Sequence, residues 1–323
     1  MGCICSFVAR ALLCASFPLA ASLGAAAQTA PAPVKLGIVS FLSGPAAAPF
    51  GIPGRNGAEI LIEAFNAGAQ RLRQPLYLWN AAVWQAMRAL LEGHLEQADE
   101  LASQALAAGV HGEGVTALQY YAIQVLAIRR EQGRIAELEE SARELVSANA
   151  HRPAWRAALA TLLWEAGRFD EARREFDSLA ANDFADIPQD GDWMIAITLL
   201  ADVCTELMDA ERAAQLYELL LPYRDGNVVI GLGAVCLGSA ARYLGRLAGT
   251  MGQRSQAVEH LRRALEANAA LQAPVHLAHT QLDYAHVLGS GPEARALIDQ
   301  ATQTAAELAL PAAARRAAEL RGV

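Results

Sequence analysis

Apolar residues recur three and four positions apart through most of the chain, in paired segments separated by a turn residue. In the clearest pair, Leu159 and Leu163 share one helix face before Gly167, and Ala172 and Phe176 share one after it. Neither face can be buried by its own helix alone. The pattern therefore predicts two amphipathic helices packed as a hairpin, with the large Phe176 filling the space one turn beyond the small Ala172.

The same spacing occurs six times along the sequence. A glycine stands five residues before each anchor residue except in one copy, where Met208 takes its place. Successive anchors are 34 to 44 residues apart, and they are Ala98, Leu138, Ala172, Ala213, Ala257 and Ala294. A period of this length with two helices per repeat is typical of an α-solenoid. The sequence predicts an all-α fold of about six helical hairpins over residues 70–323, with a last helix after Pro311.

The repeat resembles the tetratricopeptide repeat, and Leu244-Gly245 matches the Leu-Gly pair in the first helix of that motif. Residues 70–323 also resemble the C-terminal helical-repeat region of large bacterial regulators. Those regulators join a class III adenylate or guanylate cyclase domain, or a DNA-binding domain, to an AAA-type ATPase. This likeness is carried by the runs 89–93, 129–133, 153–156, 216–223 and 280–285. In that family the catalytic domains lie upstream of the repeats, so the resemblance implies an interaction region.

Residues 1–27 are predicted to form a secretory signal peptide. Arg10 precedes an apolar run that is too short and too interrupted to span a membrane, and the alanines at 25–27 before Gln28 offer a cleavage site. A functional leader would place the mature chain in the periplasm. A non-functional leader would leave it in the cytoplasm, where the regulators are found.

Residues 28–69 are predicted to contain one strand and one short helix. The apolar, β-branched run 34–42 is followed by a Ser-Gly-Pro turn and then by an amphipathic stretch at 57–67. This segment resembles the mature N terminus of periplasmic substrate-binding proteins of amino-acid and amide ABC transporters, in which the loop matching 42–45 lies near the ligand cleft. The strand–helix alternation then stops, which predicts a truncated fragment without a complete binding cleft.

Charge and motif content argue against several functions. The net charge of −8 disfavours binding to nucleic acid or to an anionic membrane surface. The sequence contains no phosphate-binding G-x-x-x-x-G-K-[ST] motif, no C-x-x-C and no H-E-x-x-H, and its glycine cluster at 231–233 is interpreted as a turn. We therefore expect no enzyme activity and no cofactor.

Polar and aromatic residues on the first helices of the hairpins are the candidate binding residues. In tetratricopeptide geometry these helices line a concave groove, and mixed aromatic, basic and acidic groups suit docking of another protein or peptide. An ordinary solvated face is the alternative interpretation. The candidate groove residues are Tyr120, Arg130, Trp164, Glu165, Asp202, Arg242, Arg246, His279 and Asp283.

One stretch within this set has the spacing of a possible metal site. His276, His279, Asp283 and His286 share one helical face, and imidazoles one turn apart can hold a transition metal. The alternative, a polar groove lining without metal, is the interpretation that the sequence favours.

Cys204 and Cys236 are the cysteines outside the first fourteen residues. Both lie in apolar surroundings, which favours two buried thiols and leaves a disulfide between them open.

Three hypotheses for the whole chain follow. The first is a non-catalytic helical-repeat scaffold for protein–protein interaction. The second is a truncated periplasmic substrate-binding component of an ABC transporter, and the third is a chimeric reading frame without function as a unit.

Overall fold

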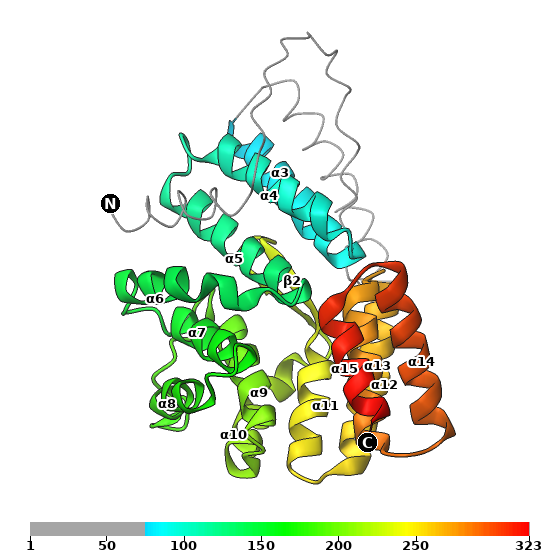
Figure 1. Cartoon of the computed structure of the whole chain (residues 1–323). Coiled ribbons are helices and arrows are strands. Elements are labelled where there is room, and N and C mark those ends of the chain that lie inside the picture. The colour runs from blue at the N-terminus through cyan, green and yellow to red at the C-terminus, as the bar shows by residue number, and fades with distance from the viewer. Residues whose placement is uncertain (1–74, 323) are drawn as a thin grey trace, which may run out of the picture.

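The computed structural model describes residues 75–322, and this part of the chain is mostly helical, as the sequence predicts. The predicted signal peptide and the fragment at 28–69 lie outside the described residues. Figure 1 shows helix pairs that follow one another along the chain. They are α3 (Pro75–Glu92) with α4 (Leu95–Gly109), α5 (Val115–Glu131) with α6 (Glu139–Ala148), α7 (Pro153–Glu165) with α8 (Phe169–Ala180), α9 (Trp193–Glu206) with α10 (Ala210–Leu220), α11 (Ala240–Thr250) with α12 (Arg254–Ala270), and α13 (Pro274–Leu288) with α14 (Pro292–Glu307). A last helix, α15 (Pro311–Arg321), ends the described chain, and short 3-10 turns η2 (Ile135–Leu138) and η3 (Leu221–Tyr223) precede α6 and follow α10.

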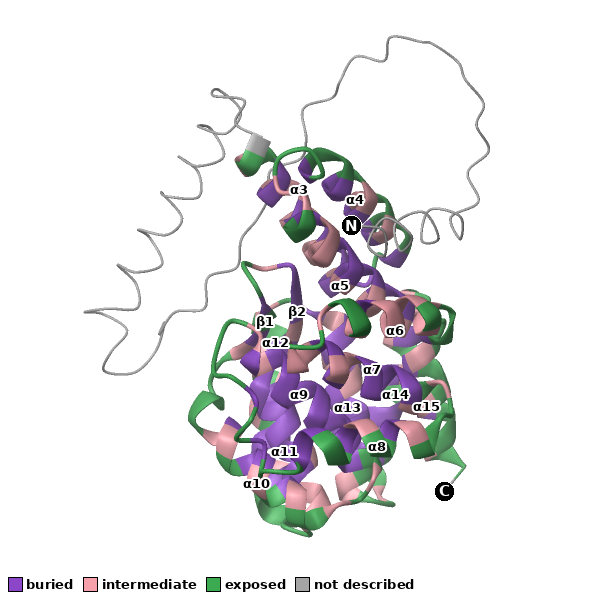
Figure 2. Cartoon of the chain, turned by 90° about the vertical axis from the view of Figure 1, so that its left-hand side faces the viewer, coloured by how far each residue is buried: buried purple, intermediate pink, exposed green. Residues whose placement is uncertain are grey.

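The apolar stripes predicted from the sequence form the core. The anchors Ala98, Ala172, Ala213 and Ala257 are all 0% exposed, and so is Phe176. Figure 2 shows the buried residues gathered on the inward faces of the helices. Small side chains at the anchors let helix backbones approach closely, and large side chains fill the space between them.

The first helices of successive pairs lie beside one another. Helix α7 packs on α9, α9 on α11, and α11 on α13. At the end of the series, α13 contacts α3 and α15 contacts α5. The helix series therefore curves until its last helices reach its first ones.

Helices α11 and α12 show why a Leu-Gly pair suits the first helix of a pair. A Cβ atom at Gly245 would lie 2.5 Å from Cγ of Leu261 on α12. Leu244 and Leu261 are both fully buried at this contact. The absent side chain of Gly245 is therefore what allows the two helices to pack this closely.

A β-hairpin interrupts the helical pattern predicted over residues 70–323, between the fourth and fifth helix pairs. Strand β1 (Asn227–Ile230) pairs antiparallel with β2 (Val235–Ser239), so the prediction of helix over this stretch is wrong. The run of β-branched residues at 228–230 and the turn at 231–233 are hairpin signals, and the interpretation of that glycine cluster as a turn is confirmed.

Side chains from several helices hold this hairpin in place. Gln124 on α5 donates to the carbonyl oxygen of Ala234 at 2.9 Å, and Trp84 on α3 donates to that of Leu232 at 2.7 Å. Asn268 on α12 accepts from the backbone N–H of Ser239 at 2.9 Å. These bonds satisfy backbone groups that a two-stranded sheet leaves unpaired, which explains how so small a sheet is stable here.

Met208 occupies the turn position that glycine holds in the other pairs, and its backbone has a φ of 56°. This left-handed conformation strains a residue with a Cβ atom, and the Met208 side chain is 69% exposed, so it adds little packing. We expect Met208→Gly to raise the free energy of unfolding by about 0.5–1 kcal/mol in urea denaturation. Val110→Gly, at an exposed position with a φ of −59°, is the control and should give no gain. An equal gain in both variants would contradict the strain argument.

Cys204 and Cys236 are both buried and free, so the two-thiol interpretation is confirmed. Burial raises the pKa of the Cys204 thiol to about 12 and also raises that of Cys236. Both thiols are therefore protonated at neutral pH, and the thiolate needed for nucleophilic attack is not formed.

Among the described helices, none has the length and apolar character needed to cross a membrane.

Candidate functional site: a charged cavity between the first helices

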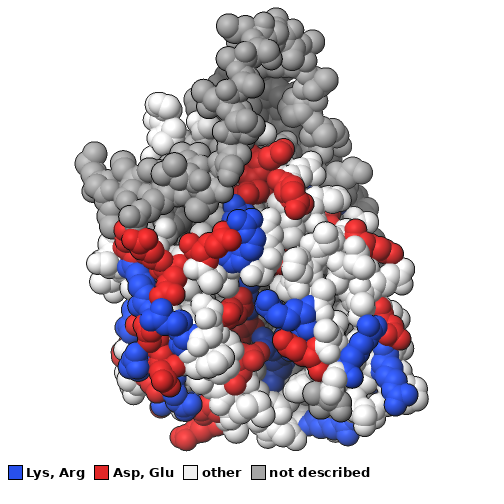
Figure 3. All heavy atoms as spheres, in the orientation of Figure 1, with Lys and Arg blue, Asp and Glu red and all other residues white. Residues whose placement is uncertain are grey.

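A cavity of about 790 Å³ opens between the first helices of the later pairs, and α15 and β2 complete its wall. Helices α5, α7, α9, α11 and α13 each place at least one charged side chain in it. Figure 3 shows acidic and basic side chains side by side in the central hollow of this face. A volume in this range matches that of pockets that bind ligands.

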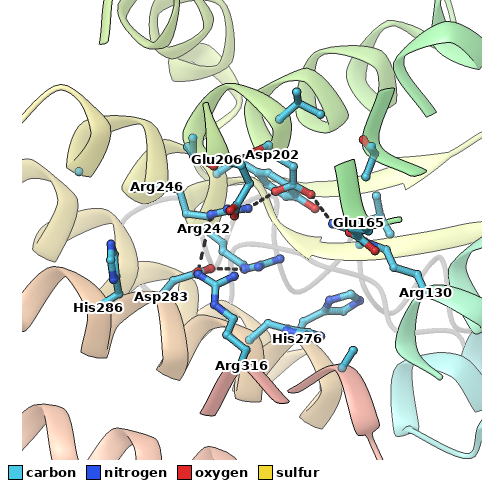
Figure 4. Close-up of a pocket in the computed structure, with 18 of the residues that line it drawn as sticks. Arg130, Glu165, Asp202, Glu206, Arg242, Arg246, His276, Asp283, His286 and Arg316 are labelled. Carbon is cyan, nitrogen blue, oxygen red and sulfur yellow. Dashed lines mark hydrogen bonds and ion pairs between the residues drawn. The ribbon is translucent and has the colours of Figure 1, made fainter. Parts of the chain in front are cut away.

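Two buried aspartates lie at the centre of the cavity wall (Figure 4). Asp283 on α13 accepts from Nε of Arg242 and from Nη2 of Arg316, each at 2.6 Å. Asp202 on α9 accepts from Nη2 of Arg130 at 3.0 Å and also from Arg246. The side chains of Asp283 and Asp202 are only 1% and 4% exposed.

These contacts join helices that are far apart in the sequence. Arg246 on α11 reaches Asp202 on α9 and Glu206 one turn further, with 2.7 Å to the latter. Arg130 on α5 pairs with Glu165 on α7 at 2.6 Å. Because each charge is satisfied by a partner on another helix, the cluster holds α5, α7, α9, α11, α13 and α15 in one arrangement.

The arginines fix the protonation of the aspartates. Burial would raise the pKa of Asp283, but the charges of Arg242, Arg316 and Arg246 outweigh it and hold that pKa well below its usual range. The same competition, with Arg246 and Arg130 as the main cations, lowers the pKa of Asp202. Both groups are therefore carboxylates at neutral pH, and neither has the pKa near 7 that general acid–base catalysis uses.

A second polar contact closes the cavity between α5 and α13. His279 lies 2.8 Å from Oε2 of Glu131. Burial would raise the pKa of Glu131, but the charge and hydrogen bond of His279 outweigh burial and lower it to about 2. This pair links the second helix pair of the described chain to the last one.

The histidine face considered as a metal site is divided among different partners. Nε2 of His276 lies 2.9 Å from the carbonyl oxygen of Cys236, His279 pairs with Glu131, and Asp283 is held by arginines. Figure 4 places His276 and His286 on opposite sides of Asp283. Within residues 75–322, no group of three His, Cys, Asp or Glu side chains is arranged to hold a metal ion.

Most of the candidate groove residues meet in this cavity. The lining includes Arg130, Trp164, Glu165, Asp202, Arg242, Arg246, His279 and Asp283. Tyr120 is the exception: its hydroxyl accepts from the backbone N–H of Leu232 at 3.0 Å, and its ring lies against Trp79. Tyr120 therefore does not line this cavity, because its side chain packs against the β-hairpin and Trp79.

Some lining residues are absent from the sequence-based set. Arg316 comes from α15, which the sequence predicts only as a last helix after Pro311, and Leu237 comes from β2. No local motif marks either residue. The only sequence signal is that α15 carries a basic stretch at 315–316 on a helix that must bury Ala313 and Ala317.

An apolar recess of about 70 Å³ adjoins the charged cavity. It is lined mainly by apolar side chains, among them Trp155, Ile195 and Leu199. The two hollows share Arg130 and Leu237 in their walls. Charged and apolar surfaces therefore lie on neighbouring walls.

Comparison with protein-family models, with curated proteins and with solved structures gives no match.

The cluster makes the stability of the fold depend on pH. Asp283, Asp202 and Glu131 have folded-state pKa values below their usual ones, so the unfolded chain binds more protons and stability falls as the pH drops below about 4.5. Burial lowers the pKa of His276 to about 4, so stability starts to fall below about pH 6.5.

We expect urea unfolding at pH 7, 6, 5, 4 and 3 to show a free energy of unfolding that declines slightly at first and more steeply below about pH 4.5. In the His276→Gln variant, the loss of unfolding free energy between pH 7 and pH 5 should be smaller. Constant stability from pH 7 to 4 would contradict this account.

Proposed function

We propose that this chain is a non-catalytic, tetratricopeptide-like α-solenoid scaffold that binds a peptide segment of another protein in the charged cavity. The observation that supports this most is the convergence of the first helices on one cavity of about 790 Å³. A repeat fold creates such a concave surface because each pair contributes its first helix to the same side.

The chemistry of the wall suits a peptide. Charged side chains can hydrogen-bond a peptide backbone or its polar side chains, and half-buried Trp164 offers an aromatic contact in the same wall. The adjoining recess is of a size to receive one apolar side chain. Aromatic residues and arginines contribute most of the binding energy in many protein interfaces.

The protonation of the site supports a scaffold over an enzyme. Its aspartates are held as carboxylates by arginines, and burial raises the pKa of the Cys236 thiol in its wall. These groups stabilise the wall, and none is an activated nucleophile or a general base. The leader-like segment 1–27 supports the periplasm as the compartment of this scaffold, and the net charge of −8 argues against nucleic acid as the partner.

Peptide display tests the proposal. A random dodecapeptide phage library is panned on the full chain, and enriched peptides are synthesised with fluorescein for anisotropy titration. We expect Trp164→Ala to weaken binding at least about tenfold, because truncation of a buried aromatic contact typically costs more than about 1.4 kcal/mol.

Tyr223→Ala is the matched control, because Tyr223 is a 43% exposed aromatic residue outside the cavity. Binding to this variant should be unchanged, and circular dichroism should show that both variants are folded. Failure to enrich any peptide, or equal affinity for Trp164→Ala and the unchanged chain, would contradict the proposed function.

A further inference from the structure

The hydrogen-bond acceptors at the centre of the charged cavity are already occupied. Oδ2 of Asp283 accepts from Arg242, and Oδ1 accepts from Arg316 and lies 3.6 Å from Nε of Arg246. Both oxygens of Asp202 likewise accept from arginines, one from Arg130 and one from Arg246. Each of these four carboxylate oxygens therefore already accepts from an arginine.

The arginine donors are not used up. Within the described chain, Arg242 donates through Nε alone and Arg316 through Nη2 alone. Each guanidinium carries five N–H groups, so each keeps N–H groups that have no acceptor in the described residues. Both residues line the cavity, and neither has a buried nitrogen without a partner, so these N–H groups face the open space. Figure 4 shows the two guanidinium groups converging on Asp283 from α11 and α15.

The surroundings of Arg316 also affect its pKa. Asp283 raises the pKa of Arg316, but desolvation and the positive charges of Arg246 and Arg242 outweigh it and lower that pKa. Desolvation is the larger of the lowering causes, and both it and the neighbouring cations disfavour the charged guanidinium of Arg316. An anion placed beside Arg316 would favour that charged form.

We propose that the site selects a peptide segment carrying an aspartate or glutamate, whose side-chain carboxylate binds between Arg242 and Arg316. This inference rests on the proposed function and adds its selectivity. A single negative charge fits better than a phosphate, because Asp283 and Asp202 lie close by and would repel a dianion.

The test uses the full chain and the enriched peptide that binds most tightly in the display experiment, acetylated and amidated so that it has no terminal charge. Its acidic position is synthesised as Glu, Gln and phosphoserine, and each form is titrated by anisotropy. We expect Gln to bind at least about tenfold more weakly than Glu, because hydrogen bonds to a charged group are stronger than those to a neutral one. Phosphoserine should not bind more tightly than Glu.

Protein variants locate the effect. Arg316→Gln should weaken the Glu peptide about tenfold and leave the Gln peptide unchanged. Arg321→Gln is the matched control, because Arg321 lies on the same helix and pairs with Asp299 outside the cavity. It should alter neither peptide. If Arg316→Gln proves unfolded by circular dichroism, the Glu and Gln peptides on the unchanged chain still decide the question.

Several outcomes would overturn the selectivity while leaving peptide binding intact. They are equal affinity of the Glu and Gln peptides, tighter binding of phosphoserine, enriched peptides without acidic residues, and binding only when the peptide has a free C-terminal carboxylate. Absence of any enriched peptide would instead contradict the proposed function itself.

Discussion

Replacing Asp283 with alanine is expected to lower the free energy of unfolding by about 3–5 kcal/mol, because it leaves buried positive charges without their shared partner. The Asp283 side chain is 1% exposed, and those of Arg242 and Arg246 are each 8% exposed. The Asp283 carboxylate contacts Arg242, Arg246 and Arg316. Its removal therefore leaves the buried arginines without a compensating negative charge. It also removes the ion pairs that join α11 and α15 to α13.

Urea denaturation followed by circular dichroism measures this effect, with Asp299→Ala as the matched control. Asp299 also pairs with an arginine, Arg321, but its side chain is 70% exposed. An exposed pair of this kind is worth at most about 1 kcal/mol, so the control should unfold near the midpoint of the unchanged protein. A loss for Asp283→Ala no larger than that of Asp299→Ala would show that the cluster does not hold the helices together.

Replacing Phe176 with alanine is expected to cost about 3–5 kcal/mol, the usual range for truncation of a buried aromatic side chain. Phe176 is 0% exposed on α8, its ring centroid lies 6.0 Å from that of Phe184, and Ala172 is buried one turn away. The surrounding helices can close the resulting cavity only in part.

Phe169 provides the comparison within the same helix. It is 54% exposed and has one ring contact, with Trp164 at 4.7 Å between centroids. Phe169→Ala should therefore cost no more than about 1 kcal/mol in the same denaturation experiment. Similar losses in the two variants would contradict the assignment of the buried stripe on α8.

Apolar spacing alone predicts much of the fold. The alanine anchors and the turn residues five positions before them mark the helix pairs, because burial of one helical face imposes a 3.6-residue period that is visible in any single repeat. Met208 shows the strength of this signal, since a residue without glycine's freedom still takes a φ of 56° at the predicted turn.

The β-hairpin at 227–239 is missed because the surrounding helical period is extended across it. Its own signals are short, and four- or five-residue strands become stable only through bonds to side chains that are distant in the sequence, such as Gln124 and Asn268. That support depends on the folded arrangement, which local patterns do not encode.

The candidate site is predicted as a set of residues but not as a network. The search for polar residues on the first helices finds Asp202 and Arg246. The two residues that form this ion pair are 44 positions apart in the sequence, and Arg130 and Asp202 are 72 positions apart. Pairing at such distances follows from how the helix series curves. Arg316 is missed for the same reason, because only the return of α15 toward α5 and α13 brings it to Asp283.

Hydrogen–deuterium exchange, with and without saturating Glu-bearing peptide, tests the central claim that the cavity between the first helices is the binding site. Added protection should concentrate in α5, α7, α9, α11 and α13, together with α15, because residues of these helices line the cavity. The second helices α4, α8, α10 and α14 should show no change. Protection confined to those outer helices, or none anywhere at saturating peptide, would contradict it.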